Sequence, residues 1–338
     1  MTKEKEKTAP RAALPVVLIA GYLGAGKTTL VNHLLRHAQG RRIAVLVNDF
    51  GSINIDAELI AAGVESAPGA AHSASVISLA GGCLCCSFGD DLVGTLAALA
   101  TRSPPLDVCL IELSGVALPA SVARSVRLVQ TVELVATLVL ADAEHIRRQA
   151  ADRYVGDTVS QQLRDADWLM LTKTDLVTPA ALQATSSWLQ QAHPQARLWA
   201  GDVQSVWPDL LLGWRAGDPQ GLTPDTPVKW PGFNGPPQTV PRGPLPRRIA
   251  PWVQPASHAA TVFESYACGL PDAVDLAALG RHLAAPTSGV LRAKALVAGQ
   301  LLQVAGGRWA VTPVAGAACG QLVMIGLVGW NPQALFSG

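Results

Sequence analysis

Hydrophobic residues in the amino-terminal part of the chain occur as short uninterrupted runs rather than in an alternating pattern. The run Val16–Ala20, for example, contains no polar residue. Strands that are buried on both faces of a sheet have such runs, because neither face has to be polar. The same pattern predicts further strands at Ile43–Val47, Val76–Leu79, Asp107–Leu113, Val135–Leu140 and Trp168–Leu171.

Segments with a helical spacing of apolar residues separate several of these predicted strands. Three of them are Asp91–Ala100, Val159–Arg164 and Pro179–Gln191. Strands that alternate with helices assemble into a mostly parallel sheet with helices on its faces, so we expect an α/β fold. In such folds the ligand binds at the carboxyl ends of the strands.

A proline-rich stretch separates this part of the chain from a second predicted unit. Of the 24 prolines, 11 fall between Pro219 and Pro255, which indicates a linker. Beyond it, one predicted helix and five predicted strands indicate a smaller α+β domain: Asp272–Leu283, then His258–Tyr266, Gly289–Val297, Leu301–Val304, Arg308–Thr312 and Gln321–Leu327. The expected division is a flexible tail at 1–12, a phosphate-binding domain at 13–214, the linker at 215–256 and a carboxyl-terminal domain at 257–330.

Composition narrows the functional class only slightly. Of the 338 residues, 49% are hydrophobic and 15% are charged, which supports sizeable cores, and the net charge of +1 gives no reason to expect nucleic acid or an acidic membrane surface as a partner. We also expect no membrane span, because no apolar run approaches about 20 residues.

Three of the six cysteines lie within four positions, which is typical of a site rather than a disulfide framework. A reducing, cytoplasmic location is therefore expected.

The run Val16–Ala20 leads into Gly21-Tyr22-Leu23-Gly24-Ala25-Gly26-Lys27-Thr28, a G-x-x-x-x-G-K-T phosphate loop, and a helical pattern follows it. Strand, loop and helix thus come in the order that this motif requires. Glycines let backbone N–H groups point into one concave nest, and the helix N-terminus adds its positive end, so a polyphosphate is expected there. Lys27 would reach the β and γ phosphates, and Thr28 would complete a Mg²⁺ shell. The residues expected to bind nucleotide here are Gly21, Gly24, Ala25, Gly26, Lys27, Thr28 and Thr29.

Two further acids are candidates for catalysis together with Lys27. Glu112 ends the predicted strand Asp107–Leu113, where a carboxylate can hold a Mg²⁺-bound water or orient the attacking water, and Gly115 would let the backbone approach the γ phosphate. Asp49 follows another predicted strand in a polar loop, where it would contact Mg²⁺ or a second metal.

The run Thr172-Lys173-Thr174-Asp175 follows the last of the first set of predicted strands. The Asp175 carboxylate can accept hydrogen bonds from the N1–H and the exocyclic amine of guanine, whereas adenine has an acceptor at N1. Thr172, Lys173 and Asp175 therefore predict GTP rather than ATP. The alternative is a solvated turn in which Asp175 lies near a helix start.

The sequence Gly81-Gly82-Cys83-Leu84-Cys85-Cys86 places three thiols on a glycine-led loop. Cys83, Cys85 and Cys86 can converge on one cation, and Zn²⁺ at neutral pH would hold them as thiolates. Cu(I), Co²⁺ and Fe²⁺ stay open, since ligand type does not select among them. The alternatives are a redox pair or buried small side chains. We interpret the isolated cysteines as core residues: Cys109, Cys268 and Cys319.

In this order, G-x-x-x-x-G-K-T-T, N-D-F-G, G-G-C-L-C-C, E-L-S-G-V-A and T-K-T-D closely resemble the CobW-like metal-chaperone GTPases, relatives of the nickel-insertion GTPases. The resemblance implies a GTPase domain that binds Zn²⁺ or another divalent ion through its C-x-C-C motif and a smaller domain that meets client metalloproteins. This chain departs from the family pattern at Asp49 and Ser52, where N-E-F-G-E is common, at Thr172, where Asn is usual, and in lacking a histidine-rich tract in the linker.

Our hypothesis from the sequence is a GTP-hydrolysing metallochaperone with slow intrinsic hydrolysis, using GTP and Mg²⁺ and delivering Zn²⁺ to a client metalloprotein. GTP with Mg²⁺ would order the loop Asn48–Asp56 and alter the geometry of the cysteine site, and hydrolysis would relax both and let the metal pass to the client. Whether GTP drives the formation of a homodimer is left open by the sequence. The first rival is a regulatory protein that senses metal or oxidation without transferring metal, and the second is a small-molecule kinase, for which no arginine-bearing lid is recognisable.

Overall fold

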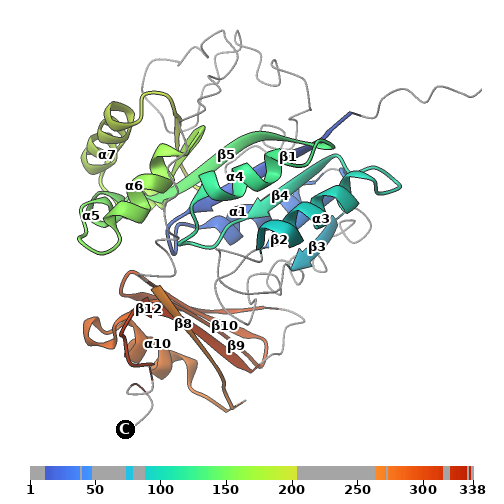
Figure 1. Ribbon diagram of the computed structural model, residues 1–338. Coiled ribbons are helices and arrows are strands. Elements are labelled where there is room, and N and C mark those ends of the chain that lie inside the picture. The colour runs from blue at the N-terminus through green and yellow to red at the C-terminus, as the bar shows by residue number, and fades with distance from the viewer. Residues whose placement is uncertain are drawn as a thin grey trace, which may run out of the picture.

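The structure is a computed structural model of the 338-residue chain. It describes residues 12–38, 40–47, 74–78, 88–203, 263–271, 273–314, 320–332 and 335, and within helix α3 and strand β3 the side chains of residues 74–78 and 88–91 are not described. Two units, each built on its own sheet, are described (Figure 1).

The first unit is built on a seven-stranded sheet in the order β3-β2-β4-β1-β5-β6-β7, and every neighbouring pair is parallel. Its strands are β1 (Leu14–Gly21), β2 (Ile43–Val47), β3 (Ala74–Ser78), β4 (Val108–Glu112), β5 (Val132–Asp142), β6 (Trp168–Thr172) and β7 (Arg197–Ala200). The carboxyl ends of β4, β1, β5 and β6 therefore lie side by side at one edge of this sheet. Any residue that ends one of these strands is close to residues that end its neighbours.

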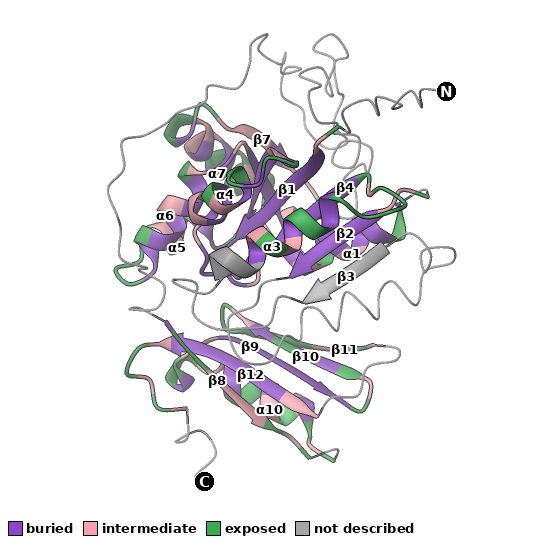
Figure 2. Cartoon of the chain, turned by 45° about the vertical axis from the view of Figure 1, so that its right-hand side comes forward, coloured by how far each residue is buried: buried purple, intermediate pink, exposed green. Residues whose placement is uncertain are grey.

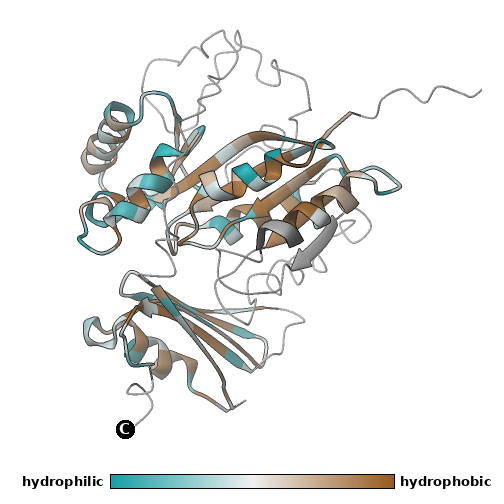
Figure 3. Cartoon of the chain, viewed as in Figure 1, coloured by the Kyte–Doolittle hydropathy of each residue, from teal (hydrophilic) through white to brown (hydrophobic). Residues whose placement is uncertain are grey.

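Apolar side chains cover both faces of this sheet. Along β1, Val16 and Leu18 belong to one buried cluster, and Val17 and Ile19 belong to another. All four are inaccessible to solvent, which explains why the strand has no polar position. β1, β2 and β4 are correspondingly buried in Figure 2 and hydrophobic in Figure 3.

Helices bury these two faces. Helix α1 (Lys27–Arg36) packs Leu30, Leu34 and Leu35 into the cluster that contains Val17. The opposite cluster takes apolar side chains from α3, α4, α6 and α7. The described helices of this unit are α1, α3 (Phe88–Ala100), α4 (Pro119–Arg127), α5 (Ile146–Ala150), α6 (Gly156–Arg164) and α7 (Pro179–Ala192), with a 3₁₀ turn η2 at Thr174–Leu176.

The second unit is built on a five-stranded antiparallel sheet in the order β11-β10-β9-β12-β8. Its strands are β8 (Phe263–Gly269), β9 (Val290–Val297), β10 (Gln300–Ala305), β11 (Arg308–Pro313) and β12 (Gln321–Leu327). Helix α10 (Leu276–Ala284) begins after Asp275, whose carboxylate accepts hydrogen bonds from the N–H groups of Ala277 and Ala278. A 3₁₀ turn, η4 (Pro286–Ser288), precedes β9.

The two units share apolar contacts. Helix α10 covers one face of the second sheet through Leu276 and Leu283. Phe263 and Ile325 instead join the large cluster of the first unit. In Figure 1 the second unit accordingly lies against the first, on the side of the loop that follows β1.

The predicted α/β class, with a mostly parallel sheet and a smaller α+β unit after it, is confirmed. Strand β7 was not predicted, because its sequence Arg197-Leu198-Trp199-Ala200 is short and begins with a charged residue. The predicted start of β8 and the Pro-rich linker fall outside the described residues, so the domain boundaries stay predictions. In the part of the chain that is described, we find no helix with the length and hydropathy of a membrane span.

Replacing Phe263, which is 2% exposed in the cluster common to both units, tests whether they share a core. We expect Phe263→Ala to lower the free energy of unfolding by about 3 kcal/mol, since it leaves a cavity. In a urea titration, the first unit of this variant should unfold at a lower urea concentration than the first unit of the native chain. Leu128→Ala is the control, because Leu128 is 74% exposed and its loss should change little. An unchanged transition of the first unit in Phe263→Ala would contradict a common core.

Candidate functional site: a nucleotide cradle at the carboxyl edge

The loop between β1 and α1 is fixed at its start by close packing against β5. Gly21 ends β1 with φ +132°, a conformation that residues with side chains rarely adopt. A Cβ at this position would lie 2.2 Å from the carbonyl oxygen of Leu140, its neighbour in β5. Gly26, at φ +99°, caps α1 from a left-handed conformation. The loop thus needs glycine at both of its ends.

Lys27 closes this loop with its own side chain. Its Nζ donates to the carbonyl oxygens of Gly21, at 2.9 Å, and of Tyr22, at 3.4 Å, and the residue is only 4% exposed. A buried ammonium group and the first amides of α1 make the enclosed side of the loop electropositive. This is the charge that a phosphate group requires.

Thr28 and Glu112 meet although 84 residues separate them in the sequence. The Thr28 hydroxyl donates to Oε1 of Glu112 at 2.7 Å. Glu112 ends β4, which pairs with β1, and it is 2% exposed. Hydroxyl and carboxylate oxygens are the ligands that Mg²⁺ prefers, so this pair fits the ion expected beside a triphosphate.

Gly115 packs against the phosphate loop itself. A Cβ on Gly115 would lie 2.3 Å from a methyl carbon of Leu23, so the Leu23 side chain fills that space. The Gln162 amide, which is buried in α6, donates to the carbonyl oxygens of Gly115 and Ala117 at 3.1 and 2.9 Å. The segment after Glu112 is therefore held by both the loop and a helix.

Thr172 joins the T-K-T-D segment, predicted to bind the base, to the phosphate loop. Its hydroxyl donates to the carbonyl oxygen of Ala25 at 2.9 Å, and it is 1% exposed at the end of β6. The next residue, Lys173, has φ +54°, and its Nζ donates to Asp142 at 2.8 Å. Asp175 follows in the exposed turn η2. The hydroxyl of Thr172 thus gives this motif a direct hydrogen bond to the loop.

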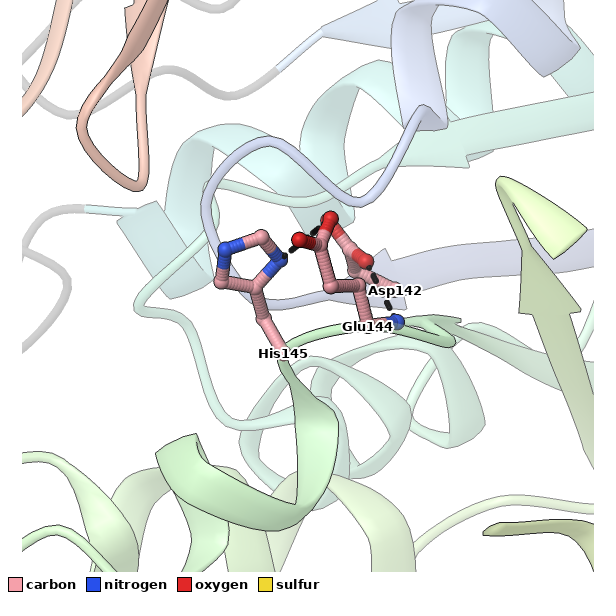
Figure 4. A group of neighbouring side chains, drawn as sticks. All are labelled: Asp142, Glu144 and His145. Carbon is pink, nitrogen blue, oxygen red and sulfur yellow. Dashed lines mark hydrogen bonds and ion pairs between the residues drawn. The ribbon is translucent and has the colours of Figure 1, made fainter. Parts of the chain in front are cut away.

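Asp142, Glu144 and His145 form a further cluster where β5 ends (Figure 4). Nδ1 of His145 lies 3.2 Å from Asp142 and 3.6 Å from Glu144 without a hydrogen bond to either. Lys173 pairs with Asp142, and Arg308 pairs with Glu144. The two carboxylates are therefore neutralised by cations of the chain itself, and we do not assign a metal to them. We did not predict this cluster, although the polar run after a buried strand was its signal.

Two of the three isolated cysteines are described, and both are free thiols. Cys109 is fully buried in β4, and burial raises its pKa to about 12. Burial also raises the pKa of Cys268. A thiol that keeps its proton is a poor metal ligand. Cys109 is a core residue, as expected from the sequence, whereas Cys268 is half-buried at the margin of the second unit's core and Cys319 lies outside the described residues.

The described edge of the sheet brings together most of the predicted nucleotide-binding residues: those of the loop Gly21–Thr29, with Glu112, Gly115, Thr172, Lys173 and Asp175. Asp49 and the cysteines Cys83, Cys85 and Cys86 lie outside the described residues. Their roles stay predictions. The same holds for the individual roles assigned to the loop residues.

Comparison with known families identifies the first unit. Residues 15–199 match the model of the CobW/HypB/UreG nucleotide-binding domain. The chain belongs to this family. The match runs from the second residue of β1 to the third residue of β7, so it covers nearly all of the parallel sheet and the cradle at its edge.

Named relatives of this CobW/HypB/UreG family member are metal-handling proteins. The zinc chaperone CobW of Pseudomonas aeruginosa is 36% identical over 198 residues, which are 51% of this chain and 52% of that protein. Zinc-regulated GTPase metalloprotein activator 1 of Dictyostelium discoideum is 27% identical over 226 residues, 58% of this chain and 47% of that protein. The chain thus spans about half the length of the curated relatives it matches. A crystal structure of the hydrogenase maturation factor HypB of Archaeoglobus fulgidus has 18% identity and a TM-score of 0.41, covering 59% of this chain and 89% of its own.

Removing the Thr172 hydroxyl tests its hydrogen bond to the phosphate loop. We expect Thr172→Val to weaken GDP binding by about tenfold, because the carbonyl of Ala25 loses its donor in a buried place. Thr172→Ser keeps the hydroxyl and should bind within about twofold of the native chain. Titration with a fluorescent GDP analogue measures both. Equal affinities for the valine and serine variants would show that this hydrogen bond does not hold the loop.

Proposed function

We propose that this protein is a GTP-hydrolysing metallochaperone that takes up a divalent metal, zinc being the first candidate, and delivers it to a client metalloprotein. The observation that carries the nucleotide part is the hydrogen bond between Thr28 and Glu112 beside the buried Lys27. The names of the relatives and the C-x-C-C motif of the sequence support the metal part.

Each part of a GTP site has a counterpart in the cradle. Backbone N–H groups of the loop and Lys27 would hold the phosphates, and Thr28 and Glu112 would hold Mg²⁺, which supplies charge neutralisation at the β and γ phosphates. Asp175 would accept hydrogen bonds from the N1–H and amine of guanine. Water attacks the γ phosphorus, the bond to the β,γ-bridging oxygen breaks, and GDP and phosphate leave.

The path of the chain supports a link between nucleotide and metal. β2 ends at Val47, whose partner in β4 is Glu112, and Asp49 comes two residues later in the sequence. β3 pairs with β2, and the cysteine motif lies in the segment between the end of β3 and the start of α3. Because the sheet is parallel, β2 and β3 both end at the edge where the cradle lies. We therefore infer that the state of the nucleotide changes the affinity for the metal.

Lys27→Ala should weaken GTP binding by about 100-fold, because it removes the ammonium group that pairs with the phosphates. The same variant should bind Zn²⁺ in the absence of nucleotide as the native chain does. Calorimetric titration with each ligand measures both affinities. The nucleotide assignment fails if GTP binds Lys27→Ala and the native chain equally well.

Cys85→Ala should weaken Zn²⁺ binding by more than the roughly 10- to 100-fold that loss of an outer-shell partner costs, since it removes a direct ligand. Cys268→Ala is the matched control, because Cys268 is a free thiol of the second unit. Binding is measured by competition with a chromogenic chelator. An unchanged affinity in Cys85→Ala would exclude the C-x-C-C motif as the metal site.

Zinc release during turnover separates a chaperone from a sensor. Protein loaded with Zn²⁺ and GTP should give up the metal to the chelator faster than protein loaded with a non-hydrolysable GTP analogue. Identical release rates would favour the regulatory alternative, in which metal is sensed and not transferred.

A further inference from the structure

The turn between β10 and β11 belongs to the second unit and contacts the cradle of the first. Ala305 and Arg308 are paired across the two strands, and Gly306 and Gly307 form the two-residue loop between them. Both glycines have positive φ angles, +60° and +76°, as a type I′ hairpin turn requires. Because β10 is hydrogen-bonded to strands on both sides, this turn is held by the sheet.

Ala305 lies directly on the phosphate loop. Gly24, in the middle of the loop, has φ +78°, and a Cβ built on it would be 2.7 Å from the Cβ of Ala305. The methyl group of Ala305 therefore occupies the space beside the loop backbone. Any movement of the loop in this direction must also move the turn.

The same turn makes two contacts with the segment after β5. A Cβ on Gly306 would lie 3.5 Å from Nε2 of His145, so its backbone covers the imidazole. The guanidinium group of Arg308 pairs with the carboxylate of Glu144. The neighbouring Asp142 accepts a hydrogen bond from Lys173 of the T-K-T-D segment. A continuous series of contacts thus links the turn to both ends of the nucleotide cradle.

We propose that the turn Ala305–Arg308 positions the phosphate loop and the segment Asp142–His145 for the nucleotide, so that the second unit contributes to nucleotide affinity. The turn lies outside the matched nucleotide-binding domain, residues 15–199. The inference rests on the nucleotide binding proposed above. A loop whose N–H groups are oriented before the ligand arrives loses less conformational entropy on binding.

The expected loss of nucleotide affinity depends on how far the contacting side chains are exposed to solvent. The side chains of Arg308 and Glu144 are 44% and 36% exposed, so their ion pair is screened by solvent. Breaking it should weaken nucleotide binding by about two- to fivefold. A larger side chain at position 305 would overpack the close contact with the phosphate loop. It should therefore weaken nucleotide binding by about tenfold or more.

The experiment uses the full chain and measures the dissociation constants of GDP and GTP, with urea unfolding of the nucleotide-free protein in parallel. The variants are Arg308→Ala, Glu144→Ala, the double variant and Ala305→Leu. Arg281→Ala is the matched control, because Arg281 is an exposed arginine on α10 that lies over the Trp309 ring. We expect Arg308→Ala and Glu144→Ala to weaken binding by similar factors and the double variant to weaken it no further.

A positioning role also predicts a change that mere structural support does not. Adding GDP to the native chain should slow amide hydrogen exchange in the peptide that contains Ala305–Arg308, and this slowing should be smaller in Arg308→Ala. The inference is overturned if Arg308→Ala and Ala305→Leu bind nucleotide as tightly as the native chain, or if Arg281→Ala weakens binding equally. A native chain that binds no nucleotide would overturn the proposed function as well, whereas tight native binding with unaffected variants overturns this inference alone.

Discussion

The cradle depends on how closely the loop after β1 packs against the strands beside it. Gly21 lies so near the carbonyl oxygen of Leu140 in β5 that no side chain fits. From β4, Glu112 accepts a hydrogen bond from Thr28, and from β6, Thr172 donates one to Ala25. Three neighbouring strands therefore fix one loop. A parallel sheet makes this possible, because it brings the carboxyl ends of all its strands to the same edge.

The second unit extends this arrangement. Phe263 and Ile325 bury apolar surface in the cluster of the first unit, which brings the two sheets together, and Ala305 then reaches Gly24. The ion pair of Glu144 and Arg308 lies at the more exposed rim of the contact. The buried apolar contact therefore stabilises the association of the two units more than this solvent-screened ion pair does. The nucleotide cradle is consequently bordered by both units, although the family match covers only the first.

Local sequence patterns predicted the parallel sheet and the residues around the phosphate loop well, because buried strands and glycine-rich turns follow from neighbouring residues alone. They could not predict that Thr172 would bond Ala25, since a hydroxyl 147 positions away becomes relevant only once β6 lies two strands from β1. The cluster of Asp142, Glu144 and His145 had a local signal, the polar residues after a buried strand, but the ion pair of Glu144 with Arg308 could not be predicted for the same reason as the Thr172 bond. Such contacts depend on how distant parts of the chain pack, and no short motif indicates that. The roles of all the candidate site residues, Asp49 and the three motif cysteines among them, stay predictions.

Selectivity for the base and the metal ion tests the account most directly. We would measure the dissociation constants of GTP and ATP for the full chain by calorimetry, with Mg²⁺ and with EDTA. We expect GTP to bind at least about tenfold more tightly than ATP, because only guanine presents an N1–H next to an exocyclic amine to the Asp175 carboxylate, whereas N1 of adenine is an acceptor. We also expect Mg²⁺ to strengthen GTP binding through Thr28 and Glu112. Equal affinity for GTP and ATP, or GTP binding that Mg²⁺ leaves unchanged, would contradict the account.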